Sequence, residues 1–419
     1  MTTGAALVEG DAAPAAPADD ATTERIAAVA AELRAGLSPL IEALAGSPPR
    51  PVRLMRRIGL DKSLASRLVQ AMKADSDGQF LHAAPSPTGL RMLVDASAGA
   101  ADATLRSKAA AAIDNFEALL DTLPGGRQAL DALLGATSAS IRRKREQVAR
   151  QAAFKAQSFL FGHYCETLVT TLFVVPSALP GRVELMEVHR RVGLQRLISS
   201  APVPLMSLLA ARPSAPATEG AAFVTDLAGD ATTRRPEDFL LASASSAPLP
   251  PLRVVDEGTM VSFVLEPAPP SRTPQRLSSA LRVLHVAGVE VEDAFISIRR
   301  YMLHTPCSAL VRDIYVAEGL WPGARLQVGF YLPGPTGSPD VRLEPGVPHH
   351  RQLHLSCEVQ PLPPGKPDHA LPGVPDQART LHDALARAGL DTLSFRGWRC
   401  TMSYPVPLVE MQIAFRFRD

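Results

Sequence analysis

Basic side chains are concentrated in one short stretch of the chain. Residues 50–73 hold seven lysines and arginines and a single acid, Asp61, which gives this stretch a formal charge of +6. The whole 419-residue chain has a net charge of only +1. Clustered cations neutralise phosphate groups and supply most non-specific affinity for DNA. The chemistry expected here is therefore the binding of a polyanion. The basic residues are Arg50, Arg53, Arg56, Arg57, Lys62, Arg67 and Lys73.

The same stretch has the pattern of two short helices separated by a tight turn. Gly59 lies where the first helix must end, and glycine tolerates the left-handed conformation of such a cap. Asp61 can accept hydrogen bonds from the free N–H groups that open the second helix. Apolar residues recur at helical spacing on both sides of the turn. They are Val52, Leu54, Met55 and Ile58 before it, and Leu64, Ala65, Leu68, Val69 and Met72 after it.

Residues 51–70 resemble the helix-turn-helix of bacterial transcription regulators, including the lactose-repressor type. Gly59-Leu60 occupies the turn, and Ala65-Ser66-Arg67-Leu68 matches an apolar-Ser-Arg-apolar run of the second helix. Met55 departs from the pattern, because the family usually has alanine there. The resemblance implies a recognition helix over 62–73 that enters the major groove of double-stranded DNA. The implied DNA-binding residues are Arg53, Arg56, Arg57, Lys62, Ser63, Ser66, Arg67 and Lys73.

These side chains are expected to differ in role. Arg53, Arg56 and Arg57 would contact phosphates and position the protein, whereas Ser66 and Arg67 would contact base edges. A regulator of this kind is expected to be a homodimer, because one recognition helix covers only a few base pairs. One alternative stays open. In this alternative the protein does not bind DNA. Its arginines are only solvated, or they bind an acidic protein partner in an adaptor or assembly protein.

Enzyme motifs are missing from the sequence: it has no GxSxG, GxxxxGK[ST], GxGxxG or HExxH pattern. His354 and Cys357 would point to opposite faces of a strand, so they would not share a metal ion. We therefore expect no metal, no cofactor and no enzymatic activity. An enzyme of unrecognised class stays open as a further alternative. Its candidate residues are His304, Cys307, His354 and Glu358.

Hydrophobic periodicity predicts an α+β multidomain protein. Residues 1–24 are acidic and rich in alanine and proline, so they are expected to be a disordered tail. A helix-turn-helix domain is expected over 25–100 and a helical connector over 101–165. Residues 166–419 are expected to form a sheet-rich α/β region, with a break between two subdomains near 267–280. The expected strands are 167–175, 252–266, 281–299, 325–332, 351–359, 392–404 and 409–418, with one helix at 377–388 and a turn, a short strand and a second turn within 75–89.

Composition excludes several classes of protein. The near-zero net charge excludes a histone-like polycation and a solvating acidic chain. Four cysteines without a CxxC pair exclude a disulfide scaffold, and together with the lack of a secretory signal they favour a cytoplasmic location. The longest apolar run, 168–175, is too short to span a membrane. By analogy with regulator architecture, the C-terminal region is expected to bind an unknown small-molecule effector or to build the oligomer.

Overall fold

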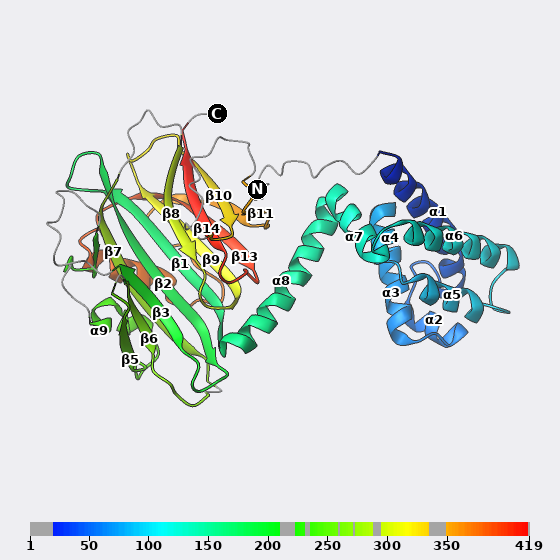
Figure 1. The fold of residues 1–419 in the computed structure, drawn as a ribbon, viewed down its shortest axis with the longest axis horizontal. Helices are drawn as coiled ribbons and strands as arrows, with labels where there is room; N and C mark the ends of the chain where they lie inside the picture. Colours follow the sequence, from blue (N-terminus) through cyan, green and yellow to red (C-terminus); the bar gives the residue numbers. More distant parts are fainter. Residues whose placement is uncertain are drawn as a thin grey trace. The chain divides into compact units, whose positions relative to one another are not determined.

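The structure is a computed structural model that describes residues 20–209, 223–230, 235–258, 260–270, 273–287, 295–334 and 349–417 (Figure 1). The chain divides into two compact units, a helical unit that ends at Glu146 and a sheet-rich unit that begins at Gln147. This arrangement of helices followed by sheets confirms the α+β class. Among the described residues, no helix combines the length and the apolar character that crossing a bilayer requires.

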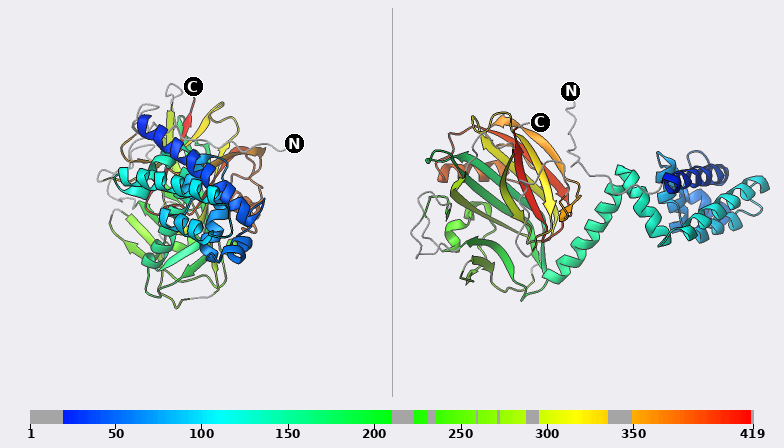
Figure 2. Two further views of the ribbon diagram at one scale, coloured as in Figure 1. Left: turned by 90° about the vertical axis from the view of Figure 1, so that its right-hand side faces the viewer. Right: turned by 45° about the horizontal axis from the view of Figure 1, so that its top comes forward.

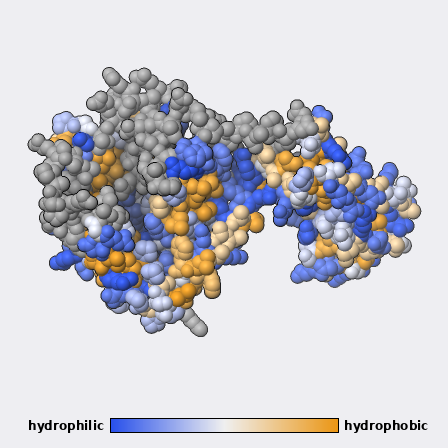
Figure 3. Space-filling model, viewed as in Figure 1, coloured by the Kyte–Doolittle hydropathy of each residue, from blue (hydrophilic) through white to orange (hydrophobic). Residues whose placement is uncertain are grey.

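Eight helices account for the chain from Asp20 to Phe161. The apolar faces of α1 to α7, with Ile141 at the start of α8, pack into one core, to which Leu37 of α1 and Phe116 of α6 both contribute fully buried side chains. The helices α1 and α6 lie side by side (Figure 2), and a Cβ placed on Gly36 would contact Ala112. The surface of this unit seen in Figure 3 is largely hydrophilic. The helices are α1 Asp20–Ala45, α2 Pro51–Ile58, α3 Lys62–Met72, α4 Asp77–Ala83, α5 Pro87–Ala96, α6 Ala103–Thr122, α7 Gly126–Thr137 and α8 Ala139–Phe161.

The helical unit differs from the expectation in three places. The first helix begins at Asp20, inside the expected tail, and residues 1–19 lie outside the described part of the chain. The core extends across the expected boundary at residue 100, because α6 and α7 pack against α1 to α5. The prediction of a short strand within 75–89 was wrong, since α4 forms there. Ser76 caps α4 by accepting a hydrogen bond from the Gln79 N–H at 3.3 Å, and Phe80 is buried in the core.

The sheet-rich unit contains a seven-stranded sheet in the order β12-β13-β9-β1-β2-β7-β4. Smaller sheets have the orders β11-β10-β14-β8 and β3-β6-β5. In the seven-stranded sheet, β1 and β9 pair in parallel and the other described pairs are antiparallel. The strands are β1 His163–Pro176, β2 Arg182–Arg196, β3 Val203–Leu209, β4 Phe223–Thr225, β5 Leu252–Asp256, β6 Met260–Leu265, β7 Gln275–Ala287, β8 Phe295–Met302, β9 Cys307–Ala317, β10 Arg325–Tyr331, β11 Gln352–Leu353, β12 Glu358–Gly365, β13 Phe395–Ser403 and β14 Glu410–Arg416.

Two central strands, β2 and β9, were not predicted from the sequence. Both carry charged residues in apolar surroundings, and these charges interrupt the hydrophobic pattern of a buried strand. In the structure the charges are buried and have partners. Arg399 donates two hydrogen bonds of 2.8 Å to the carboxylate of Asp313 on β9. Arg190 on β2 donates to the Gln377 side chain at 2.7 Å.

The expected break near 267–280 overlaps the start of β7. Gln275 already pairs with Leu194 of β2, so β7 crosses the end of this segment and joins the central sheet. The expected strand at 252–266 is a hairpin of β5 and β6. The expected strand at 281–299 covers the end of β7 and the start of β8, with 288–294 outside the described residues.

Both faces of the seven-stranded sheet are covered. On one face, Phe173, Tyr315 and Phe395 pack against Leu381 of α10 (Gln377–Arg387), the helix expected at 377–388. On the other face, a larger core joins residues from all three sheets. Short helical turns at Pro236–Phe239 (α9) and Ala242–Ala244 (η1) lie at the edge of this body.

Candidate nucleic-acid interface

The turn between α2 and α3 has the geometry that its residues predict. Gly59 ends α2 in the left-handed conformation, with φ 70° and ψ 20°, and its N–H donates to the Met55 carbonyl at 3.0 Å. A Cβ at this position would contact nothing within 4 Å, so the need for glycine is conformational and not one of space. The Asp61 carboxylate accepts hydrogen bonds from the N–H groups of Ser63 at 2.7 Å and Leu64 at 3.3 Å. These contacts cap α3 at its first turn.

The apolar residues of the pair fix its position on the helical unit. Leu54 of α2 and Leu60 of the turn are buried, as are Ala65, Leu68 and Val69 of α3. All five belong to the single core of the unit. Met55, where the resembling family usually has alanine, is half-buried against the same core. The inward face of α3 is therefore buried in the core of the helical unit, and only its outward face can contact a ligand.

All eight predicted DNA-binding residues are exposed. On α3 the exposed positions recur at helical spacing, so they share one face. The same face carries Gln70, which is also exposed and which the charge argument overlooked because glutamine is neutral. Its spacing of three residues from Arg67 was the available signal. The structure thus places one basic and polar face on α3, made of Lys62, Ser63, Ser66, Arg67, Gln70 and Lys73.

Two of the predicted phosphate contacts also support the fold. Arg53 donates to the Ala45 carbonyl at the end of α1 at 3.5 Å, and Arg57 donates to the Ala100 carbonyl at 3.4 Å. Both distances are long, so these hydrogen bonds are weak. Arg56 has no such contact to the described residues. Of the three arginines on α2, Arg56 is therefore the cleanest probe of phosphate binding.

The basic residues of 50–73 form no ion pair of 4.0 Å or less with an acid of the described chain. Elsewhere in the helical unit, Arg34 pairs with Asp77 at 3.1 Å and Arg91 with Asp114 at 2.7 Å. The segment that follows, residues 74–138, contains four basic and eight acidic residues. Positive charge in the helical unit therefore gathers in two places, on α2, α3 and their flanks and in the run Arg142, Arg143, Lys144 and Arg145 at the start of α8.

Arg127 of α7 is a further cation near α3 that the sequence analysis did not include. It donates to the carbonyls of Leu81 at 3.2 Å and Ala84 at 3.3 Å, and it pairs with Asp131. Burial lowers the pKa of Arg127, and the nearby positive charge of Arg67 lowers it further. Arg67 thus has another cation as its neighbour, which favours an anion beside it.

The residues of the enzyme hypothesis lie in different environments. Cys307 is buried opposite Cys165 in the parallel pair, and burial together with the neighbouring thiol raises the pKa of Cys307. Burial lowers the pKa of His304. Glu358 is exposed at the start of β12. His354 and Cys357 lie between β11 and β12, so the expectation that one strand carries both was wrong. Within the described ranges, no three histidine, cysteine or acidic residues are grouped so as to hold a metal ion.

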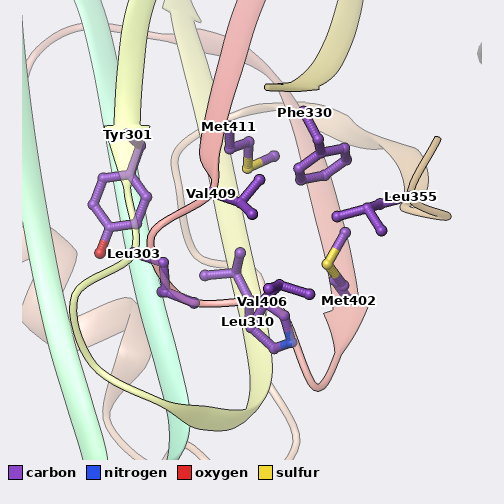
Figure 4. Close-up of a pocket in the computed structure, with 10 residues that line it drawn as sticks. Tyr301, Leu303, Leu310, Phe330, Leu355, Met402, Val406, Val409 and Met411 are labelled. Carbon is purple, nitrogen blue, oxygen red and sulfur yellow. The ribbon is translucent and has the colours of Figure 1, made fainter. Parts of the chain in front are cut away.

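The sheet-rich unit contains an apolar pocket between β8, β9, β10, β13 and β14 (Figure 4). Its cavity volume is only about 10 Å³, far below the roughly 300–1,000 Å³ of typical small-molecule sites. Tyr301 supplies a polar group at its wall, and burial raises the pKa of that phenol. The pocket offers an expected effector little polar recognition. It is lined by Tyr301, Leu303, Leu310, Phe330, Leu355, Met402, Pro405, Val406, Val409 and Met411.

No protein-family model matches the chain, and no curated protein is similar to it. Among solved structures, the chain is similar to a protein from Parabacteroides distasonis that is provisionally assigned as a protease. The two share 9% sequence identity with a TM-score of 0.24. The match covers 61% of this chain and 40% of the other, so the chain spans about two fifths of that protein. A TM-score this low does not indicate a shared fold.

Proposed function

We propose that the helical unit binds double-stranded DNA through α2, the turn and α3, and that the protein is a bacterial transcription regulator of the cytoplasm. One observation carries this proposal: the inward face of α3 is buried, while its outward face is exposed, cationic and without an ion pair to any acid of the described residues. A helix in that state, preceded by a second basic helix, matches what a major groove accepts.

The proposed roles follow from position. Lys62, Ser63, Ser66 and Arg67 lie in the first half of α3, the part of a recognition helix that contacts base edges. Arg56 on α2 and Lys73 at the end of α3 would contact phosphates. Arg53 and Arg57 would do so as well, while also holding the carbonyls of Ala45 and Ala100.

The sheet-rich unit is proposed to build the oligomer and to receive any effector. The apolar pocket is too small to hold a ligand as it stands, so an effector would have to widen it. The oligomeric role has more support, since the unit carries exposed apolar side chains on α8. A homodimer would present two recognition helices to two half-sites.

The proposal is tested by selection of duplexes from a random-sequence library with the full-length protein. Enrichment of one short motif is expected, and the double variant Arg56→Ala/Arg67→Ala should fail to enrich it. Enrichment of nothing beyond the starting library would contradict sequence-specific binding. A protein that binds polyanionic peptides as well as any duplex would instead be the adaptor with an acidic partner. Salt dependence alone does not separate the two, because both are electrostatic.

A further inference from the structure

The helix α8 turns its polar side toward its own sheet. Within the sheet-rich unit, Arg150 is buried and donates to the Ser356 carbonyl at 3.5 Å. Gln151 donates to the Tyr404 hydroxyl at 3.4 Å, and Ser158 is buried, with its hydroxyl donating to the Phe154 carbonyl. Phe154 adds ring contacts to Tyr404 on the same side. A surface helix normally buries an apolar stripe, whereas the buried side of α8 mixes the polar Arg150 and Gln151 with Phe154.

The opposite side of α8 is apolar and exposed. Val148, Phe159 and Leu160 are 67%, 70% and 75% exposed, the three highest values for large hydrophobic side chains in the described chain. The surface between them consists mainly of exposed alanines, with one charge, Lys155. A band of hydrophobic surface follows this helix in Figure 3. We call this surface the α8 face; it comprises Val148, Ala149, Ala152, Lys155, Ala156, Phe159 and Leu160.

The apolar character continues beyond the end of the helix. The N–H groups of Leu197 and Ile198 both donate to the Gly162 carbonyl, which fixes the turn after β2 against the end of α8. Leu197 and Ile198 are 43% and 41% exposed. Monomeric proteins seldom leave such a continuous apolar surface uncovered.

We propose that the α8 face binds the α8 face of a second copy of this chain, so that the protein is a two-fold symmetric dimer. A two-fold interface places the same surface on both partners, so that surface must complement itself. The α8 face meets this condition in its apolar and small side chains, which pack against their own kind. Its one charge, Lys155, lies on a long flexible side chain that can keep its ammonium group in water at the edge of the contact. The alanines allow two helix backbones to approach closely.

The area is sufficient for a specific contact. From the exposed fractions and ordinary side-chain areas, the α8 face with Leu197 and Ile198 offers roughly 600 Å² per copy, or about 1,200 Å² for the pair. That value lies at the lower end of stable protein–protein interfaces. The link to DNA half-sites rests on the proposed function, but the self-association itself does not.

The test is sedimentation of the full-length protein without DNA. The parent is expected at twice the mass of one chain. The variant Phe159→Glu/Leu160→Glu is expected at the mass of one chain, because two buried carboxylates would face their symmetry copies. Met92→Glu, at an equally apolar and 54% exposed position on α5, is the matched control and should stay dimeric. A parent that sediments as one chain, or a double variant that remains dimeric, would overturn the proposal.

A second measurement guards against a double variant that fails to fold. Unlabelled and ¹⁵N-labelled parent proteins are mixed and treated with an amine-reactive cross-linker. Lys155 is expected to link to Lys155 across a light and a heavy chain, since it lies at the middle of the α8 face. Cross-links between copies that avoid Lys155 would overturn the assignment of this surface. A dimer that binds no duplex would refute only the DNA function, and a monomer that selects one motif would refute only the dimer.

Discussion

Replacement of Arg67 by alanine separates the functional account from a structural one. Arg67 is exposed on α3 and has no internal carboxylate partner among the described residues. Another cation, Arg127, is close enough for the charge of Arg67 to lower its pKa. Removal of its charge should therefore change the free energy of unfolding by less than about 0.5 kcal/mol. A residue that served the fold would show a larger loss.

The same substitution should weaken binding to the selected duplex strongly. A bidentate contact from arginine to a base edge contributes about 1–3 kcal/mol of discrimination, which corresponds to roughly a 5- to 150-fold loss of affinity. The loss should be smaller on scrambled duplexes, because only base contacts distinguish sequences. Arg56→Ala should instead weaken both duplexes by similar factors and reduce the slope of log affinity against log salt by about one.

Fluorescence anisotropy with labelled selected and scrambled duplexes, measured over a series of salt concentrations, gives these quantities. Arg25→Ala is the matched control, because Arg25 is an exposed arginine of α1 outside the basic stretch. Equal affinity of the Arg67→Ala and Arg25→Ala proteins for the selected duplex would refute the assigned role of α3. A large fall in thermal stability of Arg67→Ala would show that the side chain serves the fold.

Three further predictions concern stability. Asp61→Ala removes the cap of α3 and should cost about 1 kcal/mol in urea unfolding, and an unchanged midpoint would contradict the capping role. Asp313→Ala leaves the Arg399 guanidinium buried without its carboxylate and should lower the free energy of unfolding by about 3–5 kcal/mol. The double variant Asp313→Leu/Arg399→Met removes both charges and should lower it by less. Equal losses of stability in the two proteins would contradict this explanation by an unpaired buried charge. Burial lowers the pKa of His163 from 6.5 to about 4. Between these two pH values, His163 is therefore neutral in the folded protein and protonated in the unfolded chain. Stability should therefore fall between pH 6.5 and 4, by up to about 3 kcal/mol, and His163→Gln should flatten that dependence in acid titrations followed by circular dichroism.

The helices α2 and α3 could be predicted from the sequence because the residues that determine them lie close together in the chain. Gly59 and Asp61 mark the turn, and the apolar spacing gives both helices. The expected strand within 75–89 failed for a related reason: Asp75-Ser76-Asp77-Gly78 resembles a turn, but Ser76 caps a helix whose Phe80 has a place in the core. Only tertiary packing decides between these two outcomes.

The central sheet could not be predicted because its charged residues are partnered across long distances in sequence. Asp313 meets Arg399, and Arg190 meets Gln377, so strands that look too polar to be buried are fully covered. The parallel register of β1 and β9 joins residues about 140 positions apart, which no local pattern reveals. The same reason explains why Arg127 was not predicted as part of the candidate site. Arg127 comes near Arg67 only through the packing of α7.

The most direct test of the central claim is photo-cross-linking of the full-length protein to the selected duplex with a diazirine-modified thymine at single positions of its motif. Mass spectrometry then identifies the peptide that carries the nucleotide. The account predicts cross-links within 62–70 on α3, lost when unlabelled selected duplex competes and kept when scrambled duplex does. Cross-links that fall in the sheet-rich unit or at residues 142–145, with none on α3, would contradict it.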